Sequence, residues 1–168
     1  MSDILAGKVV VVTSASSGLG RAASLSAARH GAKAVLVADI TETPREGGRP
    51  RVAAATALGV AAQFVRTDVI KRGDLDVRVA ASVEFGGIDV MVANAGITAH
   101  QDSADVTEAD FDRLVAVNLK GVLFNAQAAA EAMKAQGRPG SIVLMASMGG
   151  IAGAGFTWAS PPARAAWC

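Results

Sequence analysis

The first strand-like segment of the chain leads directly into a glycine-punctuated turn, and this junction limits the fold more than any other feature. Four consecutive valines, residues 9–12, are followed by Thr-Ser-Ala-Ser-Ser-Gly-Leu-Gly at residues 13–20. Such an apolar run is typical of a buried parallel strand, and residues 17–29 have the pattern of a helix. A helix that begins in such a turn offers free N–H groups to a phosphate, and Gly18 and Gly20 allow close backbone approach. Similar turns also join strands and helices that bind nothing, so the motif alone leaves both interpretations open.

Length and composition narrow the class of protein. The 168 residues suffice for one domain with a buried core, and 51% of them are hydrophobic. A formal net charge of +1 does not indicate a nucleic-acid partner. No apolar run approaches the roughly 20 residues of a membrane span, and the N-terminus has no signal-peptide pattern. We therefore expect a soluble cytoplasmic protein without nucleic-acid or membrane partners.

Metal binding is not indicated either. Cys168 is the only cysteine, and neither His30 nor His100 has a second histidine at ligand spacing. The sequence therefore predicts no metal site and no disulfide.

Strand-like and helix-like segments alternate along the chain. The predicted strands are residues 8–13, 34–38, 62–66, 88–93 and 141–146, and the predicted helices are residues 17–30, 51–58, 74–85 and 107–136. Thr107 and Asp110 have the spacing of a capping box at the start of the last helix. Because crossovers within one sheet are right-handed, this order predicts an α/β fold, a Rossmann-type doubly wound parallel sheet of about five strands in a single domain. We expect residues 1–155 to form this dinucleotide-binding domain and residues 156–168 to form an irregular C-terminal tail.

Polar residues follow each predicted strand, at the edge where ligands of open α/β sheets bind. After the glycine turn come Asp39, then Thr67-Asp68-Val69, then Asn94-Ala95-Gly96 and finally Ser147. Asp39 lies about twenty residues past the glycines, where a carboxylate accepts hydrogen bonds from a ribose diol. Any one such residue is equally well a helix cap or a loop filler. Their gathering at one edge favours a nucleotide site.

In this order, the motifs resemble those of the short-chain dehydrogenase/reductase family. The family's Thr-Gly-x-x-x-Gly-x-Gly aligns with residues 13–20, its Asp-Val with residues 68–69 and its Asn-Asn-Ala-Gly with residues 93–96. The family's active-site asparagine and serine match Asn118 and Ser147. The resemblance implies an NAD(P)-dependent oxidoreductase that transfers a hydride between a nicotinamide cofactor and a small-molecule alcohol or carbonyl substrate.

The resemblance also implies roles for individual residues. Catalysis falls to Ser147 and Asn118, and the family's dimers imply a homo-oligomer through the helix at residues 107–136. NAD is expected in preference to NADP, because the Asp39 carboxylate repels a 2′-phosphate. Three arginines that follow, Arg45, Arg49 and Arg51, argue for NADP, but in a polar loop they are expected to be solvated. The residues that match cofactor-binding positions are Ser14, Ser17, Gly18, Leu19, Gly20, Asp39, Ile40, Asp68, Val69, Asn94, Ala95 and Gly96.

Two positions depart mildly from the cofactor motifs. Ser14 stands where the family has its first glycine, so the turn must accept a side chain there, and its hydroxyl is expected to cap the following helix. Ala93 replaces the first asparagine of Asn-Asn-Ala-Gly, which removes one hydrogen-bonding side chain. Asn94 either satisfies the backbone of its own turn or packs beside the adenosine ribose, and the family match favours the ribose.

The family's catalytic tyrosine and lysine are both absent from this sequence. The chain contains no tyrosine, its last lysine is Lys134, and Ser160 stands at the expected tyrosine position, followed by Pro161 and Pro162. Prolines do not fit inside the helix that carries Tyr-x-x-x-Lys in the family. General acid–base catalysis contributes about 10²–10⁴-fold, so we expect little turnover. The chain is expected to be a truncated or inactive form whose tail arises from a shifted reading frame after Ser160. A non-catalytic nucleotide-binding or interaction module is the alternative.

Overall fold

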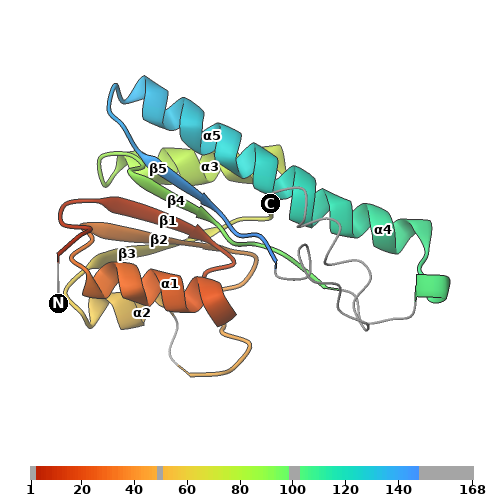
Figure 1. Ribbon diagram of the computed structural model, residues 1–168. Coiled ribbons are helices and arrows are strands. Elements are labelled where there is room, and N and C mark those ends of the chain that lie inside the picture. Colours follow the sequence, from red (N-terminus) through yellow and green to blue (C-terminus); the bar gives the residue numbers. More distant parts are fainter. Residues whose placement is uncertain (1–2, 49–50, 99–102, 148–168) are drawn as a thin grey trace.

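The computed structural model describes residues 3–48, 51–98 and 103–147, and within them the chain forms one five-stranded sheet (Figure 1). All neighbouring strands are parallel, in the order β3-β2-β1-β4-β5. The predicted Rossmann-type doubly wound sheet is therefore confirmed. The strands are β1 (Val9–Thr13), β2 (Ala34–Asp39), β3 (Ala61–Arg66), β4 (Val90–Ala93) and β5 (Ser141–Leu144).

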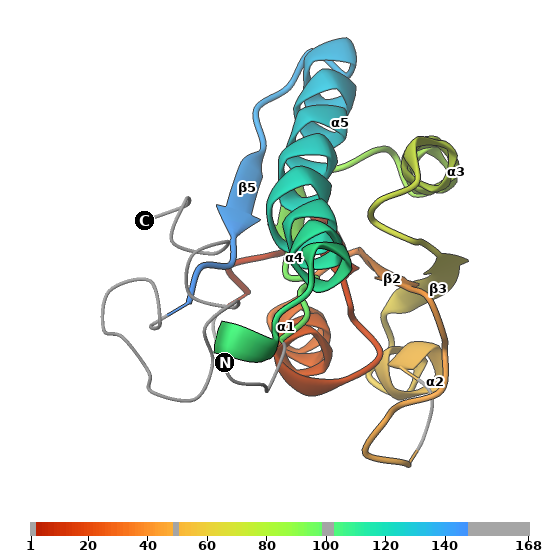
Figure 2. The same cartoon turned by 90° about the vertical axis from the view of Figure 1, so that its right-hand side faces the viewer.

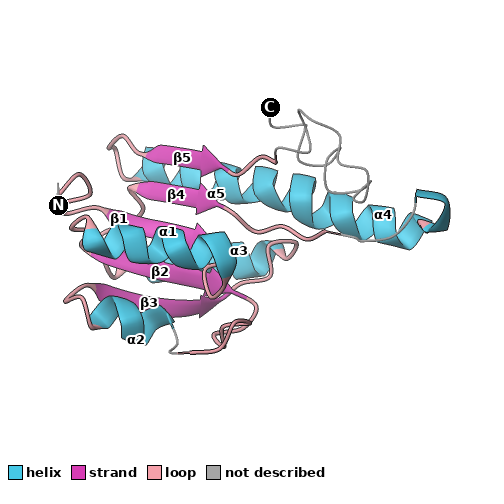
Figure 3. Cartoon of the chain, turned by 60° about the horizontal axis from the view of Figure 1, so that its bottom comes forward, coloured by secondary structure: helices cyan, strands magenta, loops and turns pink. Residues whose placement is uncertain are grey.

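Helices cover both faces of the sheet (Figures 1 and 2). One face carries α1 (Gly18–Arg29) and α2 (Arg51–Thr56). The other carries α3 (Arg72–Val83) and a long helix composed of α4 (Glu108–Val115), the π-helical segment η2 (Ala116–Gly121) and α5 (Val122–Ala135), which a 3₁₀ turn, η1 (Ser103–Asp105), precedes. Each predicted element is present, with ends that differ by no more than about two residues. The strands all point the same way, so their carboxyl ends share one edge (Figure 3).

The four valines of β1 explain why this strand has no polar face. Val9 and Val11 belong to the core between the sheet and α5, whereas Val10 and Val12 belong to the core beneath α1 and α2. Side chains alternate between the two faces of a strand, and both faces here are covered. Each of the four side chains is at most 2% exposed. A polar residue at any of these positions would therefore be buried in one of the two cores.

The long helix begins with the predicted capping box but is not α-helical throughout. The Asp110 N–H donates to Thr107 Oγ1 at 3.2 Å, and the Thr107 N–H donates to Asp110 Oδ2 at 3.3 Å. The predicted single helix at residues 107–136 instead contains η2, in which the backbone widens to i→i+5 bonding. A hydrophobic pattern with a period near 3.6 does not resolve this local change of pitch, so the sequence did not reveal it.

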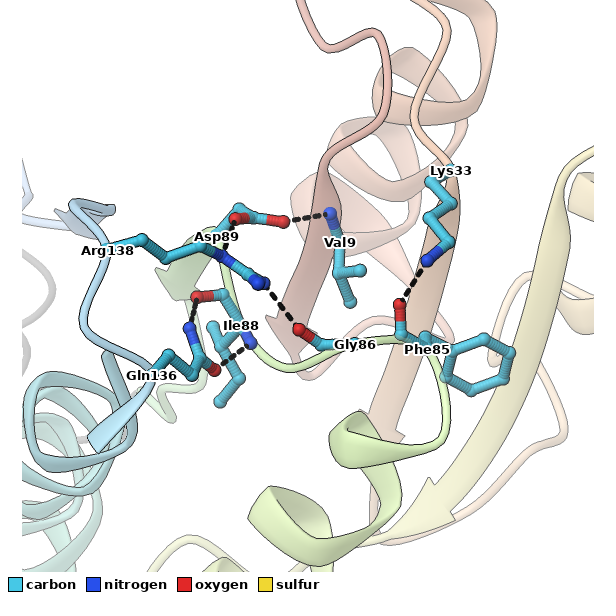
Figure 4. Close-up of polar contacts among 8 residues, drawn as sticks. All are labelled: Val9, Lys33, Phe85, Gly86, Ile88, Asp89, Gln136 and Arg138. Atoms are coloured by element: carbon cyan, nitrogen blue, oxygen red, sulfur yellow. Dashed lines mark hydrogen bonds and ion pairs between the residues drawn. The ribbon is translucent and has the colours of Figure 1, made fainter. Parts of the chain in front are cut away.

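Polar contacts at the amino edge of the sheet fasten the end of α5 to β1 and β4 (Figure 4). The Asp89 carboxylate accepts from the Val9 N–H at 2.8 Å and from Arg138 Nε at 3.0 Å. The Gln136 amide accepts from the Ile88 N–H at 2.6 Å and donates to the Ile88 carbonyl at 3.0 Å. We call Asp89, Gln136 and Arg138 the amino-edge clasp.

β5 forms one edge of the sheet within the described part of the chain. Its main chain is hydrogen-bonded to β4 and its flanks, through the Ser141 N–H to the Asp89 carbonyl at 2.9 Å and the Met145 N–H to the Ala93 carbonyl at 3.2 Å. Exposed and partly buried side chains alternate along this strand, and Val143 is 44% exposed.

A charged side chain is buried where α3 meets α5. Arg78 is fully inaccessible to solvent, and its Nη1 donates to Asn125 Oδ1. Its Nε and Nη2 have no hydrogen-bond partner among the described residues. Burial lowers the pKa of Arg78 to about 10, so the side chain still carries its charge at neutral pH.

Several expectations fall on residues 148–168, which lie outside the described residues. The irregular tail and the position of Ser160 therefore stay predictions. Within the described ranges, no helix combines the length and the apolar character needed to cross a membrane. In that same part of the chain, no three or more histidine, cysteine, aspartate or glutamate side chains lie together so as to hold a metal ion.

Candidate functional site

Two adjoining cavities lie at the carboxyl edge of the sheet. The first, of about 230 Å³, is lined by the predicted residues Ser14, Asp39, Ile40, Asp68, Val69, Ala95 and Gly96. The second, of about 260 Å³, is lined by the predicted residues Ser14, Ser17, Gly18, Leu19, Asp39, Asn94 and Gly96. Every predicted cofactor residue except Gly20 therefore lines one of them. The loops after β1, β2, β3 and β4 together form a continuous hollow surface.

Backbone geometry accounts for the small residues in the turn after β1. Gly18 has a φ of +53°, and Ser14 has a φ of +51°, a region that residues with a side chain seldom adopt. A Cβ atom at Gly20 would overlap the Ser14 carbonyl oxygen and lie 2.7 Å from Asn94 Nδ2. Gly20 therefore serves the close packing of α1 against the strand ends, which agrees with its absence from the cavity walls.

Asp39 is held in place by the backbone around it. Its Oδ2 accepts from the Ser16 N–H at 2.9 Å, and its Oδ1 accepts from the Ile40 N–H at 2.8 Å. The residue is only 9% exposed, yet it lines both cavities. Each carboxylate oxygen has more than one lone pair, so both oxygens still have capacity to accept bonds from a ligand diol.

The turn after β4 is tied to the end of β1 through Thr13. The backbone N–H groups of Asn94 and Ala95 both donate to Thr13 Oγ1, at 2.9 and 3.0 Å. Asn94 Nδ2 donates to the Thr13 carbonyl at 3.1 Å. The Asn94 side chain therefore bonds to the end of β1 and not to the backbone of its own turn, and Asn94 also lines the second cavity.

After β3, the segment Asp68-Val69 forms one wall of the first cavity. Asp68 Oδ1 accepts from the Ile70 N–H at 3.3 Å, and its Oδ2 lies 3.7 Å from Lys71 Nζ. Asp74, in the first turn of α3, accepts from the Asp68 N–H at 2.8 Å. These local bonds hold the carboxylate at the cavity, and the next side chain, that of Val69, is buried.

Asn118 and Ser147, the two expected catalytic residues, lie on different elements. Asn118 is fully buried within η2, where its Oδ1 accepts from the Ile97 N–H at 2.8 Å and its Nδ2 donates to the Ile97 carbonyl at 2.9 Å. Asn118 thereby fixes the loop after β4 to the long helix. Ser147 follows β5 at the carboxyl edge and is partly exposed.

The first turn of α1 is capped from a distant loop. Its N-cap residue, Ser17, makes no side-chain capping bond, and its first turn contains no acidic residue. Glu46 Oε1 instead accepts from the Gly18 N–H at 2.7 Å, and the Arg45 N–H donates to Ser17 Oγ at 2.8 Å. Hydrogen bonds from its own backbone N–H and, second, from the Gly18 N–H lower the pKa of the Glu46 carboxyl below its usual value. The prediction that Ser14 caps α1 is therefore wrong, because Ser14 lies in the preceding turn and Ser17 is the N-cap residue.

Further residues that the sequence did not signal contribute to the site. Arg45 lines both cavities, although its loop was expected to be merely solvated. Ile97, Arg113 and Val117 add to the first cavity from the loop after β4 and from the long helix. No local motif marks these residues, since they reach the site only through the tertiary packing of the long helix and two loops.

Comparison with known proteins assigns the chain to a family. A family described as short chain dehydrogenase matches residues 8–160. The chain belongs to the short-chain dehydrogenase/reductase family. It is 39% identical over 163 residues to an L-rhamnose 1-dehydrogenase (NAD(P)(+)) of Sphingomonas sp. (strain SKA58), a match that covers 96% of this chain and 63% of that protein. This short-chain dehydrogenase/reductase thus spans less than two thirds of that relative's length.

Solved structures of dehydrogenases have the same fold. A short-chain type dehydrogenase/reductase from Mycobacterium marinum matches with a TM-score of 0.88 and 33% identity over 99% of this chain and 69% of that one. A xylitol dehydrogenase with bound NAD⁺ matches with a TM-score of 0.86 and 29% identity over 98% of this chain and 62% of that one.

Proposed function

We propose that this chain binds NAD at the carboxyl edge of the sheet, as the cofactor-binding part of an oxidoreductase acting on alcohol or carbonyl groups. The observation that carries the proposal is Asp39, a backbone-anchored carboxylate that lines both cavities. A carboxylate there accepts bonds from both ribose hydroxyls and repels a 2′-phosphate, which favours NAD over NADP.

The residues of the two cavities fit a dinucleotide. The first turn of α1 would offer the pyrophosphate the positive end of its dipole and N–H groups, among them that of Gly18, which Glu46 accepts in this structure. Asp39 and Ile40 would hold the adenosine ribose, and Asp68 and Val69 would flank the adenine. The turn from Asn94 to Gly96 would support the rest of the cofactor. When bound, NAD supplies the acceptor for a hydride.

For the substrate, the two catalytic candidates have different tasks. The Ser147 hydroxyl would donate a hydrogen bond to the substrate oxygen and orient it. Asn118 would act by positioning, because its amide holds the Ile97 backbone beside the first cavity. The names of the relatives, an L-rhamnose dehydrogenase and a xylitol dehydrogenase, suggest a sugar or a polyol as the substrate class.

A non-catalytic nucleotide-binding module is the second candidate, and a specific observation favours it. The sequence contains no tyrosine and no lysine after Lys134, so it has neither partner of the family's proton-transfer pair. A serine hydroxyl is too weak an acid to replace the tyrosine. Turnover separates the two candidates: NADH formation from L-rhamnose or xylitol supports the oxidoreductase, whereas NAD binding without turnover supports the module.

Titration calorimetry with NAD and NADP tests the cofactor proposal. NAD is expected to bind the 168-residue chain about tenfold or more tightly than NADP, because one uncompensated charge contact is worth about 1.4 kcal/mol. Asp39→Asn should narrow this preference, and Asp76→Asn, on the outer face of α3, should leave it unchanged. Tighter binding of NADP to the unaltered chain would refute the NAD preference, and binding of neither cofactor would refute the proposed function.

A further inference from the structure

A carboxylate from a distant loop occupies the amino end of α1. Glu46 lies 28 positions from Gly18 in sequence, and its Oε1 accepts the Gly18 N–H at 2.7 Å. The α1 helix supplies no acidic residue in its own first turn and no side-chain cap from Ser17. The first N–H groups of a helix have no partner within the helix, and here the Glu46 carboxylate accepts one of them. We call residues 41–48, which contain Glu46, the strap.

Glu46 lies in the same hollow as the residues proposed to hold the cofactor. The second cavity is lined by Glu46 and Arg45 of the strap together with Gly18, Leu19 and Asp39. A carboxylate and a pyrophosphate are both anionic hydrogen-bond acceptors, and both are stabilised by the positive end of a helix dipole. A single N–H group aimed at one acceptor is not available to another with good geometry.

The strap is anchored at its base and exposed at its tip. At the base, Ser16 Oγ donates to the Thr41 carbonyl at 2.6 Å, and the Pro44 side chain is buried. At the tip, Gly47 and Gly48 have φ values of +72° and +91°, and Glu46 is exposed. Displacing the tip therefore breaks polar contacts at the surface and leaves the core closed.

From these contacts we infer that Glu46 is an internal competitor for the anion-binding end of α1. In the protein without cofactor, its carboxylate holds the Gly18 N–H, and cofactor binding displaces the tip of the strap. Glu46 thereby lowers the affinity of the site for a pyrophosphate-containing ligand. This inference rests on the proposed function, because it names a residue that sets the affinity of the same site.

Two probes, inorganic pyrophosphate and NAD, test the inference through the NMR signal of the Gly18 amide. Glu46→Gln removes the charge and Glu46→Ala removes the acceptor as well. Both variants are expected to bind each probe about two- to fivefold more tightly, the range for one charge at an exposed helix terminus. Without ligand, the Gly18 amide should also exchange faster with solvent in Glu46→Ala. Glu42→Gln removes the same charge from the same strap and should match the unaltered chain.

The possible results separate this inference from the proposed function. Pyrophosphate affinity that is unchanged or weaker in both Glu46 variants overturns the inference, and so does a lack of pyrophosphate binding by every variant. If pyrophosphate binds more tightly to the Glu46 variants but none of them binds NAD, the internal competition stands and the proposed function falls.

Discussion

At Ser14, a residue with a side chain adopts a backbone conformation that suits glycine. The left-handed region costs a non-glycine residue about 1–2 kcal/mol, and glycine loses roughly 0.5–1 kcal/mol more conformational entropy than alanine on folding. Ser14→Gly is therefore expected to raise the free energy of unfolding by about 0.5–1 kcal/mol, measured by urea denaturation. Ser17→Gly, at an extended N-cap position, is the control and should not stabilise. A destabilised Ser14→Gly variant would mean that the hydroxyl has a structural role.

Arg78 carries its charge in a core where only one of its nitrogens has a hydrogen-bond partner among the described residues. Replacing buried charges by apolar side chains is often neutral or stabilising by about 1–4 kcal/mol, and none of the ion pairs formed by the described residues involves Arg78. Arg78→Met is thus expected to raise the free energy of unfolding by about 1–3 kcal/mol. Arg72→Met, on the exposed face of the same helix, should change it by less than about 1 kcal/mol. Destabilisation by Arg78→Met would show that the bond to Asn125 outweighs desolvation.

The pH dependence of the Arg78→Met effect follows from the lowered pKa of Arg78. Its pKa is about 10 in the folded protein and higher in the unfolded chain, so the unfolded state binds the proton more strongly. The destabilisation by this charge is fully present below about pH 10 and decreases above it. The advantage of Arg78→Met should therefore be constant between about pH 6 and 9 and smaller above about pH 10, measured by denaturation at each pH. An advantage that disappears near neutral pH contradicts this.

Among the secondary-structure elements, α5 is joined to β4 by the shared core and, at its C-terminal end, by the amino-edge clasp. The Gln136 amide is the partner of both the N–H and the carbonyl of Ile88. Gln136→Ala leaves both partly buried groups without these bonds and should lower the free energy of unfolding by about 1–3 kcal/mol. Hydrogen exchange of the Ile88 amide should also accelerate. Lys134→Ala, two residues earlier and exposed, serves as the matched control. Unchanged exchange at Ile88 would mean that water replaces the side chain without loss.

At the scale of the whole molecule, β5 forms an edge of the sheet among the described residues, and such an edge is prone to intermolecular contact. Its N–H groups bond alternately to β4, so those of Ile142 and Leu144 face away from the sheet. The strand contains no charged residue and no proline, the residues that commonly protect such an edge from pairing with another chain. We expect the 168-residue chain to self-associate through β5 in size-exclusion chromatography. Val143→Lys should reduce association, and Val83→Lys, an equally apolar exposed site on α3, should not.

Two results would contradict self-association through the edge of β5. A monodisperse monomer in which the amides of Ile142 and Leu144 are strongly protected from exchange would contradict self-association through this strand. A dimer that survives Val143→Lys would instead direct attention to the helix at residues 107–136, the other surface that the family resemblance implies for assembly.

Much of the sheet and its polar edge was predictable because the signals are local. The valine run of β1, the capping box at Thr107 and the turn residues after each strand act within a few positions of themselves. Asp39 and Asn94 could be placed at one edge because parallel strands end together. The contact between Glu46 and Gly18 could not be predicted from the sequence, since it joins segments far apart in the chain. The burial of Arg78 was also hidden, because a charged residue on a helix is usually solvated.

The amino edge of the sheet, where the clasp lies, is a suitable place to attach a label to this protein. It lies at the far end of the strands from the two cavities, and a five-residue strand such as β1 spans about 16 Å. The turn at Gly59, between α2 and β3, opens at that same remote end, and its Cα faces open space. A short epitope or fluorophore tag inserted there would report on the molecule or tether it to a surface, while the cofactor side stays free to face the solution.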